Sequence, residues 1–248
     1  MKKKEQTQQM NNSSFDKPIL ELRNIEKKYD DKVVLKRVNL KIKPQEYVAI
    51  VGQSGSGKST LMNIIGAFDR DFTGEFLFMD QKLDHSSSSI YRNNHIGFIF
   101  QQFNLIPGLT VLENIMLPYA FSKRVIPSIN EKCKQYLDEF GLAGKDNQNV
   151  STLSGGEKQR VALIRSIIMD PEIILADEPT GNLDPYNSKL ISDFLFRMNK
   201  EDKVIIVVTH DLEFANNAKR KMCIKNGEII DITQDFAVGK NIFESIYC

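Results

Sequence analysis

The sequence contains no tryptophan and only three cysteines, Cys133, Cys223 and Cys248. They lack the paired spacings of a structural zinc site or a disulfide framework, and so few thiols suit a reducing cytosol. No uninterrupted apolar run exceeds five residues, whereas a membrane-spanning helix needs about 20. The formal net charge is +1, which gives no electrostatic reason to expect a nucleic-acid partner. The sequence therefore predicts a chain that neither spans a membrane nor binds nucleic acid.

The start of the chain also lacks a hydrophobic segment. Met1–Lys4 is basic, as in a signal peptide, but the residues that follow are polar, so export is not expected. We expect residues 1–17 to form a disordered polar tail, with contact between its lysines and anionic lipid as an alternative. The 248 residues, 41% hydrophobic and 26% charged, are typical of one large globular domain or of two lobes.

A glycine-rich stretch lies in the first quarter of the chain and reads Gly52–Gln53–Ser54–Gly55–Ser56–Gly57–Lys58–Ser59–Thr60. It matches the phosphate-binding pattern G-x-x-x-x-G-K-S, and it separates the apolar run Tyr47–Val51 from a helical pattern. Glycines let the backbone curl around phosphate, and the N-terminus of a helix attracts anions. We expect Lys58 to reach the outer phosphates of a triphosphate and the Ser59 hydroxyl to bind Mg²⁺. The alternative is an ordinary glycine- and serine-rich turn before a helix.

The remaining sequence alternates between strand and helix patterns. The patterns predict strands at residues 19–22, 33–42, 75–79, 96–100, 173–177 and 204–208, helices at 112–119, 129–140, 154–169 and 187–199, and a hairpin at Asn226–Gly227. Tyr29 is expected in a charged turn after the first strand, and residues 80–89, which include four consecutive serines, as a flexible connector. The sequence predicts a helical lobe at about residues 102–165, inserted into a sheet domain, and a C-terminal tail at 233–248.

A second candidate anion site lies where another helix is predicted to begin. Ser154 is a good N-cap, and Gly155 and Gly156 free backbone N–H groups for an anion, with Glu157 next in the first turn. The same pattern is also found at helix starts that bind nothing, so the site is only a candidate at this point.

Polar side chains follow two of the predicted core strands. Asp177 and Glu178 end the apolar run Ile173–Ala176, and His210 comes two residues after the strand Val204–Val208. Parallel strands deliver functional groups at their carboxyl ends. Asp177 suits a Mg²⁺ carboxylate, Glu178 a base that polarises a water for attack on a γ-phosphate, and His210 a hydrogen bond to that phosphate. Two solvated acids in a turn are the alternative.

Taken together, the motifs closely resemble those of the ATP-binding cassette (ABC) ATPases over roughly residues 18–232. The resemblance implies an α/β fold: a P-loop NTPase (RecA-like) core with an antiparallel β subdomain and an inserted α-helical lobe. It implies that Tyr29 stacks on adenine, that Gly52–Thr60 is the Walker A loop, and that Gln101 links Mg²⁺ and the attacking water to a membrane partner. It further identifies Leu153–Gln159 (with Ser154–Glu157) as the signature motif, Asp177 as the Walker B acid, Glu178 as the catalytic glutamate, Gly181–Asp184 as the D-loop and His210 as the switch histidine.

The resemblance also implies cofactors and partners. It implies ATP and Mg²⁺, the latter held by Ser59, Gln101 and Asp177. It further implies a homodimer with two ATPs sandwiched head-to-tail between one chain's Walker A loop and the other's Ser154–Gly156. The resemblance also implies an integral-membrane permease as a partner, which would place the chain peripherally at the cytoplasmic face of the cell membrane. Phe103, Leu105 and Ile106 either line the groove for the permease or belong to the lobe core.

Several stretches resemble one clade of the family, which holds lipoprotein-releasing, macrolide-export, antimicrobial-peptide-resistance and cell-division ATPases. These stretches are residues 96–101, 103–107, 109–114 and 176–184. The clade implies that ATP-driven dimer closure drives a permease for export, lipoprotein release or peptide resistance by mechanotransmission. Residues 69–73 and 163–167 depart from the clade's usual pattern and leave the exact subfamily open. The alternatives are an ATP-dependent structural regulator of the cell-division type and a soluble ATPase of repair or translation.

Overall fold

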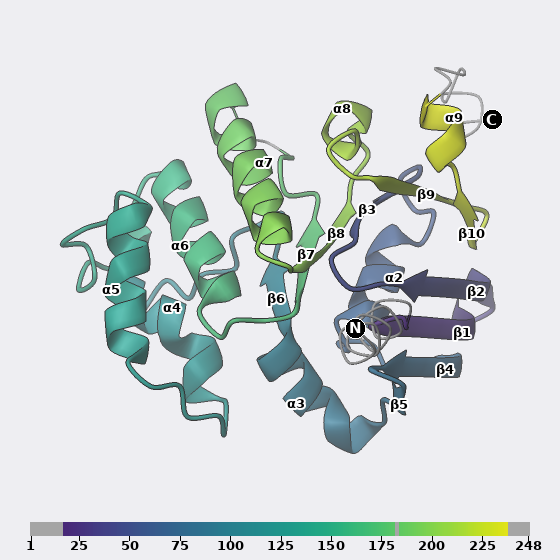
Figure 1. Cartoon of the computed structure of the whole chain (residues 1–248), viewed down its shortest axis with the longest axis horizontal. Helices are drawn as coiled ribbons and strands as arrows, with labels where there is room; N and C mark the ends of the chain where they lie inside the picture. The colour runs from purple at the N-terminus through teal and green to yellow at the C-terminus, as the bar shows by residue number, and fades with distance from the viewer. Residues whose placement is uncertain (1–16, 182–183, 238–248) are drawn as a thin grey trace, which may run out of the picture.

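The computed structural model describes residues 17–181 and 184–237, which form two β-sheets and a set of helices (Figure 1). The strands are β1 (Leu20–Tyr29), β2 (Lys32–Ile42), β3 (Tyr47–Val51), β4 (Thr73–Phe78), β5 (Gln81–Lys82), β6 (Ile96–Ile99), β7 (Ile173–Asp177), β8 (Val204–Val208), β9 (Arg220–Lys225) and β10 (Glu228–Asp231). The helices are α2 (Lys58–Ile65), α3 (His85–His95), α4 (Val111–Ala120), α5 (Ile129–Glu139), the short 3₁₀ turn η1 (Val150–Thr152), α6 (Gly155–Ile167), α7 (Pro185–Lys200), α8 (Leu212–Ala215) and α9 (Thr233–Ala237). The predicted tails lie largely outside the described residues, as do two positions of the predicted D-loop.

The larger sheet has six strands in the order β10-β9-β3-β8-β7-β6. Strands β9, β3, β8, β7 and β6 run parallel, and β10 pairs antiparallel with β9. The predicted strands of this sheet and the hairpin at Asn226–Gly227 are confirmed, because long buried apolar runs and an Asn-Gly turn are strong signals. All the parallel strands therefore end at the same edge of the sheet, which brings the residues that follow them together.

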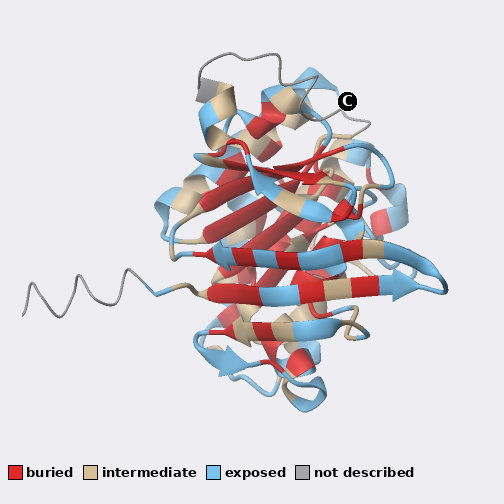
Figure 2. Cartoon of the chain, turned by 90° about the vertical axis from the view of Figure 1, so that its right-hand side faces the viewer, coloured by how far each residue is buried: buried red, intermediate tan, exposed pale blue. Residues whose placement is uncertain are grey.

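The smaller sheet is antiparallel in the order β2-β1-β4-β5. The prediction of a short first strand followed by a turn that holds Tyr29 is wrong, because β1 continues through Tyr29. The charged residues after Leu22 stay in the strand because β1 pairs with both β2 and β4, with register shifts after Leu22 that disturb the alternation of apolar residues. Figure 2 faces this sheet and shows buried and exposed residues alternating along its strands.

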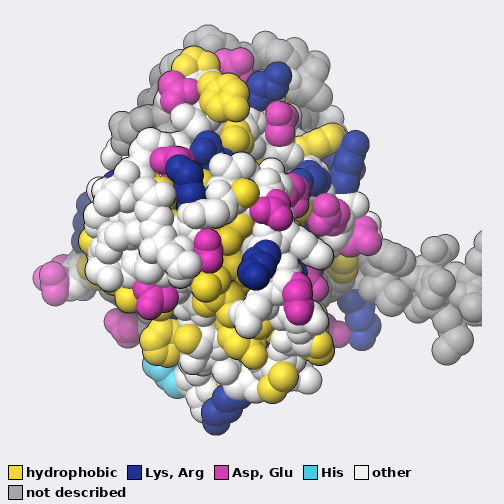
Figure 3. Space-filling model, turned by 90° about the vertical axis from the view of Figure 1, so that its left-hand side faces the viewer, with side chains coloured by type: hydrophobic (Ala, Val, Ile, Leu, Met, Phe, Trp, Pro, Cys, Tyr) yellow, Lys and Arg dark blue, Asp and Glu magenta, His cyan; other side chains and the backbone are white. Residues whose placement is uncertain are grey.

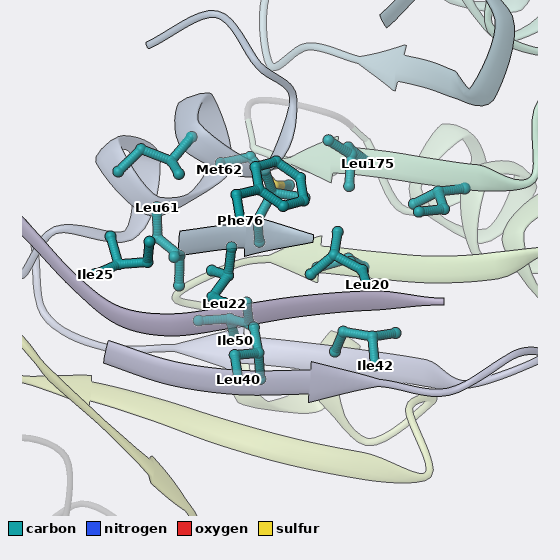
Figure 4. Close-up of a cluster of buried hydrophobic side chains, with 14 of the residues drawn as sticks. Leu20, Leu22, Ile25, Leu40, Ile42, Ile50, Leu61, Met62, Phe76 and Leu175 are labelled. Carbon is teal, nitrogen blue, oxygen red and sulfur yellow. The ribbon is translucent and has the colours of Figure 1, made fainter. Parts of the chain in front are cut away.

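Two apolar cores cover the two faces of the six-stranded sheet, and alternate residues of β3, β7, β8 and β9 belong to different cores. On β3, Val48 and Ile50 face the smaller sheet and α2, whereas Ala49 and Val51 face the other core with α7. The first core also contains the apolar side chains of β1, β2 and β4 (Figure 4). The loop between β3 and α2 is therefore anchored at both of its ends in one buried cluster.

Residues 85–95 form helix α3, so the prediction of a flexible serine-rich connector over residues 80–89 is wrong for its second half. Asp84 caps the helix: its carboxylate accepts from the Ser87 N–H at 2.8 Å, and the Ser87 hydroxyl accepts from the Asp84 N–H at 3.0 Å. Tyr91 is buried and packs edge-on against Phe76 and Phe78. The capping box and this packing outweigh the weak helix preference of the serines.

Helices α4, α5 and α6 share a third apolar core, which includes Val111, Cys133 and Ile164. The predicted helices of this region are confirmed within two residues at each end. Helix α6 also packs tightly against β6, since a Cβ placed on Gly97 would lie 2.1 Å from the Ser166 carbonyl oxygen. Among the described residues, no helix is both long and apolar enough to cross a bilayer.

The close approach of α6 to β6 predicts that Gly97→Ala lowers the free energy of unfolding by about 1–3 kcal/mol, the usual cost of overpacking a core. Urea denaturation measures this. Gly108→Ala is the control, because a Cβ on Gly108 meets nothing within 4 Å. Equal stability of the two variants would contradict the tight packing.

Candidate functional site

A cleft of about 1100 Å³ opens at the carboxyl edge of the parallel strands. It is lined by Tyr29–Lys32, Val34, Gly52–Gly55, Gly57–Thr60, Gln101, Glu178 and His210. The predicted Walker A loop, Tyr29, Gln101, Glu178 and His210 are thus brought together, although they come from distant parts of the sequence. Asp30, Asp31, Lys32 and Val34 were missed by sequence reasoning; their only signal was adjacency to Tyr29 in the chain.

The loop between β3 and α2 presents backbone donors to this cleft. Gly57 precedes the helix with φ +105°, and a Cβ there would lie 2.9 Å from Leu35 and 3.1 Å from the Val34 carbonyl oxygen. Only glycine fits that position. No side chain caps α2, so the N–H groups of its first turn are available to an anion in the cleft.

Lys58 is held inside the loop. It is 8% exposed, and its Nζ donates to the Gly52 and Gln53 carbonyl oxygens at 2.7 and 2.8 Å. Burial lowers the pKa of Lys58, while the charges of Glu178 and Asp177 act against that shift. The ammonium is therefore fixed among the donors of the loop, where a phosphate oxygen would exchange for a carbonyl.

Asp177 is suited to a metal ion. Its Oδ1 is buried and has no hydrogen-bond partner among the described residues, and burial followed by the nearby Glu178 raises its pKa, against the effect of Lys58. Ser59 and Gln101 supply further oxygens at the cleft wall. In the part of the chain that the structure describes, no three His, Cys, Asp or Glu side chains cluster as a metal cage. Such a sparse oxygen set fits Mg²⁺, which usually takes one or two carboxylates plus phosphate oxygens and waters.

Glu178 follows β7 in a left-handed conformation, with φ +46°. Its backbone N–H donates to the Val208 carbonyl oxygen at 2.8 Å. Its Oε2 accepts from the Thr209 hydroxyl at 3.2 Å and lies 2.9 Å from His210 Nδ1. The two strand ends therefore hold a carboxylate and an imidazole in direct contact at the cleft.

Gln101 reaches the same region from β6. Its Nε2 would lie 3.1 Å from a Cβ on Gly181, and the Gly181 N–H donates to the Glu178 carbonyl oxygen at 3.1 Å. The turn after Glu178 thus packs directly against Gln101. Of the predicted D-loop, the structure describes only Gly181 and Asp184, which caps α7.

The predicted signature motif does not line the cleft. Ser154 caps α6, and Glu157 accepts from the Ser154 N–H at 2.8 Å and from its hydroxyl at 2.9 Å. Contact with Lys145, followed by these bonds, lowers the pKa of Glu157 to about 2. A Cβ on Gly155 would meet nothing within 4 Å, so the start of α6 faces outward. The carboxylate of Glu157 is engaged in the cap rather than offered to a ligand.

A family model described as "ABC transporter" matches residues 35–181. The chain belongs to the ABC transporter family. It is an ATP-binding cassette ATPase of that family, and the α/β P-loop fold inferred from its motifs is confirmed.

Individual ABC proteins are similar over most of the chain. The macrolide export ATP-binding/permease protein MacB of Pasteurella multocida is 40% identical over 238 residues, which are 93% of this chain and 36% of that protein. The chain spans about a third of the length of the MacB relatives it matches. The ABC transporter ATP-binding protein MJ0796 of Methanocaldococcus jannaschii is 43% identical over 85% of this chain and 95% of that protein.

Solved structures of MJ0796 are also similar to the chain. Its dimeric cassette has a TM-score of 0.76 at 42% identity, covering 85% of this chain and 96% of that one. A dimeric post-hydrolysis state of the same cassette, bound to ADP and Pi, has a TM-score of 0.75 at 40% identity with the same coverage.

The position of Lys58 predicts that Lys58→Ala lowers the affinity for ATP by about a hundredfold or more, because charge-assisted hydrogen bonds to the phosphates are lost. Isothermal titration measures the affinity. Lys36→Ala removes a lysine of the neighbouring strand β2 that lies outside the cleft lining, and it is the control. An unchanged affinity of Lys58→Ala would refute the assigned role.

Proposed function

We propose that this chain is the ATP-hydrolysing subunit of a membrane transporter and that it works as a head-to-tail dimer around two ATPs. The observation that carries the proposal is the separation of two anion sites on one chain. The Walker A loop lines the cleft, whereas Ser154–Gly156 starts a helix outside it. A second copy supplies the missing wall, as the dimeric form of MJ0796 suggests. The proposal treats residues 18–232 as one ATPase unit, with the helical lobe at about 102–165.

Within that dimer, the side chains at the strand ends divide the chemistry between them. Lys58 and the N-terminus of α2 bind the outer phosphates, and Tyr29 stacks on adenine. Glu178 polarises the attacking water, and its contact with His210 orients the carboxylate toward the γ-phosphate. Closure by the partner's Ser154–Gly156 excludes bulk water, so hydrolysis depends on assembly.

Ser59, Asp177 and Gln101 are the residues proposed to hold Mg²⁺. Bound Mg²⁺ would neutralise charge on the β- and γ-phosphates as the bond to the leaving group breaks. The buried, unpaired Oδ1 of Asp177 supports this assignment. Gln101 contacts the turn after Glu178, so it connects the metal site with the surface on which a membrane partner would dock.

An apolar surface next to Gln101 supports a permease partner at the cytoplasmic face of the membrane. Phe98 and Phe100 stack at 4.1 Å between ring centroids, and Phe68 meets Phe98 edge-on at 5.3 Å while remaining 48% exposed. Figure 3 views the side of the molecule that carries α4 and α5, and shows a band of hydrophobic side chains across it. Ile106 is exposed and suits this surface, whereas Leu105 packs against the lobe core.

The finer function follows the clade that the motifs resemble. Dimer closure pulls on the permease and moves its extracytoplasmic domain, which serves export, lipoprotein release or peptide resistance by mechanotransmission. The similarity to MacB supports export. A structural regulator of a membrane complex, as in the cell-division members of the clade, is the second candidate.

The role of Glu178 predicts that Glu178→Gln lowers kcat for ATP hydrolysis by about a hundredfold or more, since a general base contributes about 10²–10⁴ to the rate. The affinity for ATP should stay within about twofold, because glutamine keeps the size of the side chain and the phosphate contacts remain. A phosphate-release assay and ATP titration measure the two quantities. Hydrolysis near the wild-type rate would contradict the role assigned to Glu178.

The apolar surface next to Gln101 predicts which variants lose the membrane partner. The tagged Glu178→Gln chain, purified in detergent from its native host with ATP, should bring down a permease with four membrane helices and a large outer domain. Adding Phe68→Ser should abolish that capture, whereas Phe196→Ser, at a similarly exposed phenylalanine of α7, should not. Capture of only a soluble complex would overturn the transport function and leave the ATPase chemistry standing.

A further inference from the structure

A buried lysine lies beside the proposed adenine-stacking tyrosine. Lys27 is on β1, two residues before Tyr29, and is only 3% exposed. Its Nζ donates to Asp69 Oδ1 at 3.0 Å, to Asp71 Oδ2 at 3.2 Å and to the Asp71 carbonyl oxygen. A buried ammonium needs such partners, because leaving it unpaired would be very costly. Lys27 does not line the cleft, so it does not bind the nucleotide itself.

The same group of side chains contacts the tyrosine at two places. Asp69 Oδ2 accepts a hydrogen bond from the Tyr29 hydroxyl at 3.1 Å. The Lys27 ammonium lies 4.7 Å from the centroid of the Tyr29 ring, which is a cation–π distance. The hydroxyl end and one face of an otherwise half-exposed ring are thus both held, and the ring borders the cleft.

Asp69 is itself fixed by the turn that follows α2. Its Oδ1 accepts from the Asp71 N–H at 2.9 Å as well as from Lys27. Burial alone would raise the pKa of Asp69, but the bonds from Lys27, Asp71 and Tyr29 outweigh it and the pKa is lowered. Burial alone would lower the pKa of Lys27, but its bonds to Asp69 and Asp71 outweigh it. The pair is therefore ionised at neutral pH.

A stacking surface on the protein exterior binds a base more tightly if it is already oriented. A free tyrosine side chain loses rotamer freedom when a base stacks on it, and that loss weakens binding. Here the ring is held before any ligand arrives, with Lys27 over one face while the residue stays half-exposed at the cleft. A ligand without a base would gain nothing from this arrangement.

We propose that Lys27 and Asp69 are positioning residues for nucleobase recognition, which hold the Tyr29 ring so that it stacks on the base of a bound nucleoside triphosphate. The proposal rests on the nucleotide site of the proposed function. It adds the prediction that these two residues affect only ligands that carry a base.

Comparing ATP with inorganic tripolyphosphate separates this role from general damage to the fold, because both ligands use the Walker A loop and only ATP carries a base. Asp69→Ala and Lys27→Met should each raise the Kd for ATP by about threefold to tenfold, the range expected for one aromatic contact. The Kd for tripolyphosphate should not change. KM for ATP should rise in parallel, while kcat at saturating ATP stays within about twofold.

The first control removes a carboxylate from a different ion pair. Asp80→Ala breaks the exposed ion pair with Lys17, at 3.0 Å, neither of which lines the cleft, and should change neither affinity. Tyr29→Phe keeps the ring but deletes its bond to Asp69, and should weaken ATP alone, by about twofold to threefold. In a Tyr29→Ala background, Asp69→Ala should have no further effect on ATP, because the two residues act as one unit.

An equal loss of affinity for ATP and tripolyphosphate in both Asp69→Ala and Tyr29→Phe would overturn the proposal, as would unchanged ATP affinity in these variants. The proposal would also be overturned if the effects of Asp69→Ala and Tyr29→Ala on the Kd for ATP were fully additive. Failure of the proposed function looks different: the wild-type protein would then bind neither ATP nor tripolyphosphate.

Discussion

The site depends on the register of three parallel strands. Val208 of β8 is aligned with Ile50 of β3 on one side and with Asp177 of β7 on the other. The ladder continues one step past the strands, because the Thr209 N–H donates to the Ile50 carbonyl oxygen and the Glu178 N–H donates to the Val208 carbonyl oxygen. These two backbone bonds fix where the Walker A loop leaves the sheet, where the carboxylate of Glu178 stands, and where His210 follows. A slip of one residue would turn each of these side chains to the opposite face.

The same register is the reason for proposing a second chain at the site. Glu178 and His210, which follow two of the strands, line one cleft with the Walker A loop, whereas the capped start of α6 belongs to a different core and faces outward. Gly97 packs that helix against β6 too closely to let it slide. A rigid link between the two anion sites supports the proposal that a second molecule, rather than bending of the first, closes the gap between them.

Much of the site follows from the sequence because its signals are local. A strand, a glycine-rich loop and a helix start in direct succession predict the position of Lys58, and an apolar run that ends in two acids predicts Asp177 and Glu178. The length of β1 and the existence of α3 were not predictable in this way. β1 is held by pairing on both sides and α3 by a capping box and the burial of Tyr91, so tertiary contacts override weak local preferences. The pairing of Lys27 with Asp69 spans 42 residues and has no local signature at all.

In the proposed dimer, each nucleotide is enclosed by two chains. Light scattering of the Glu178→Gln chain with and without MgATP tests it most directly, with Gly155→Glu added as the contrast. The side chain at position 155 has open space around it in the single chain, but its carboxylate would repel phosphates across the dimer. We expect the mass to double from 28.3 kDa on addition of MgATP, and to remain at 28.3 kDa when Gly155→Glu is also present. A chain that binds MgATP and remains monomeric would contradict it.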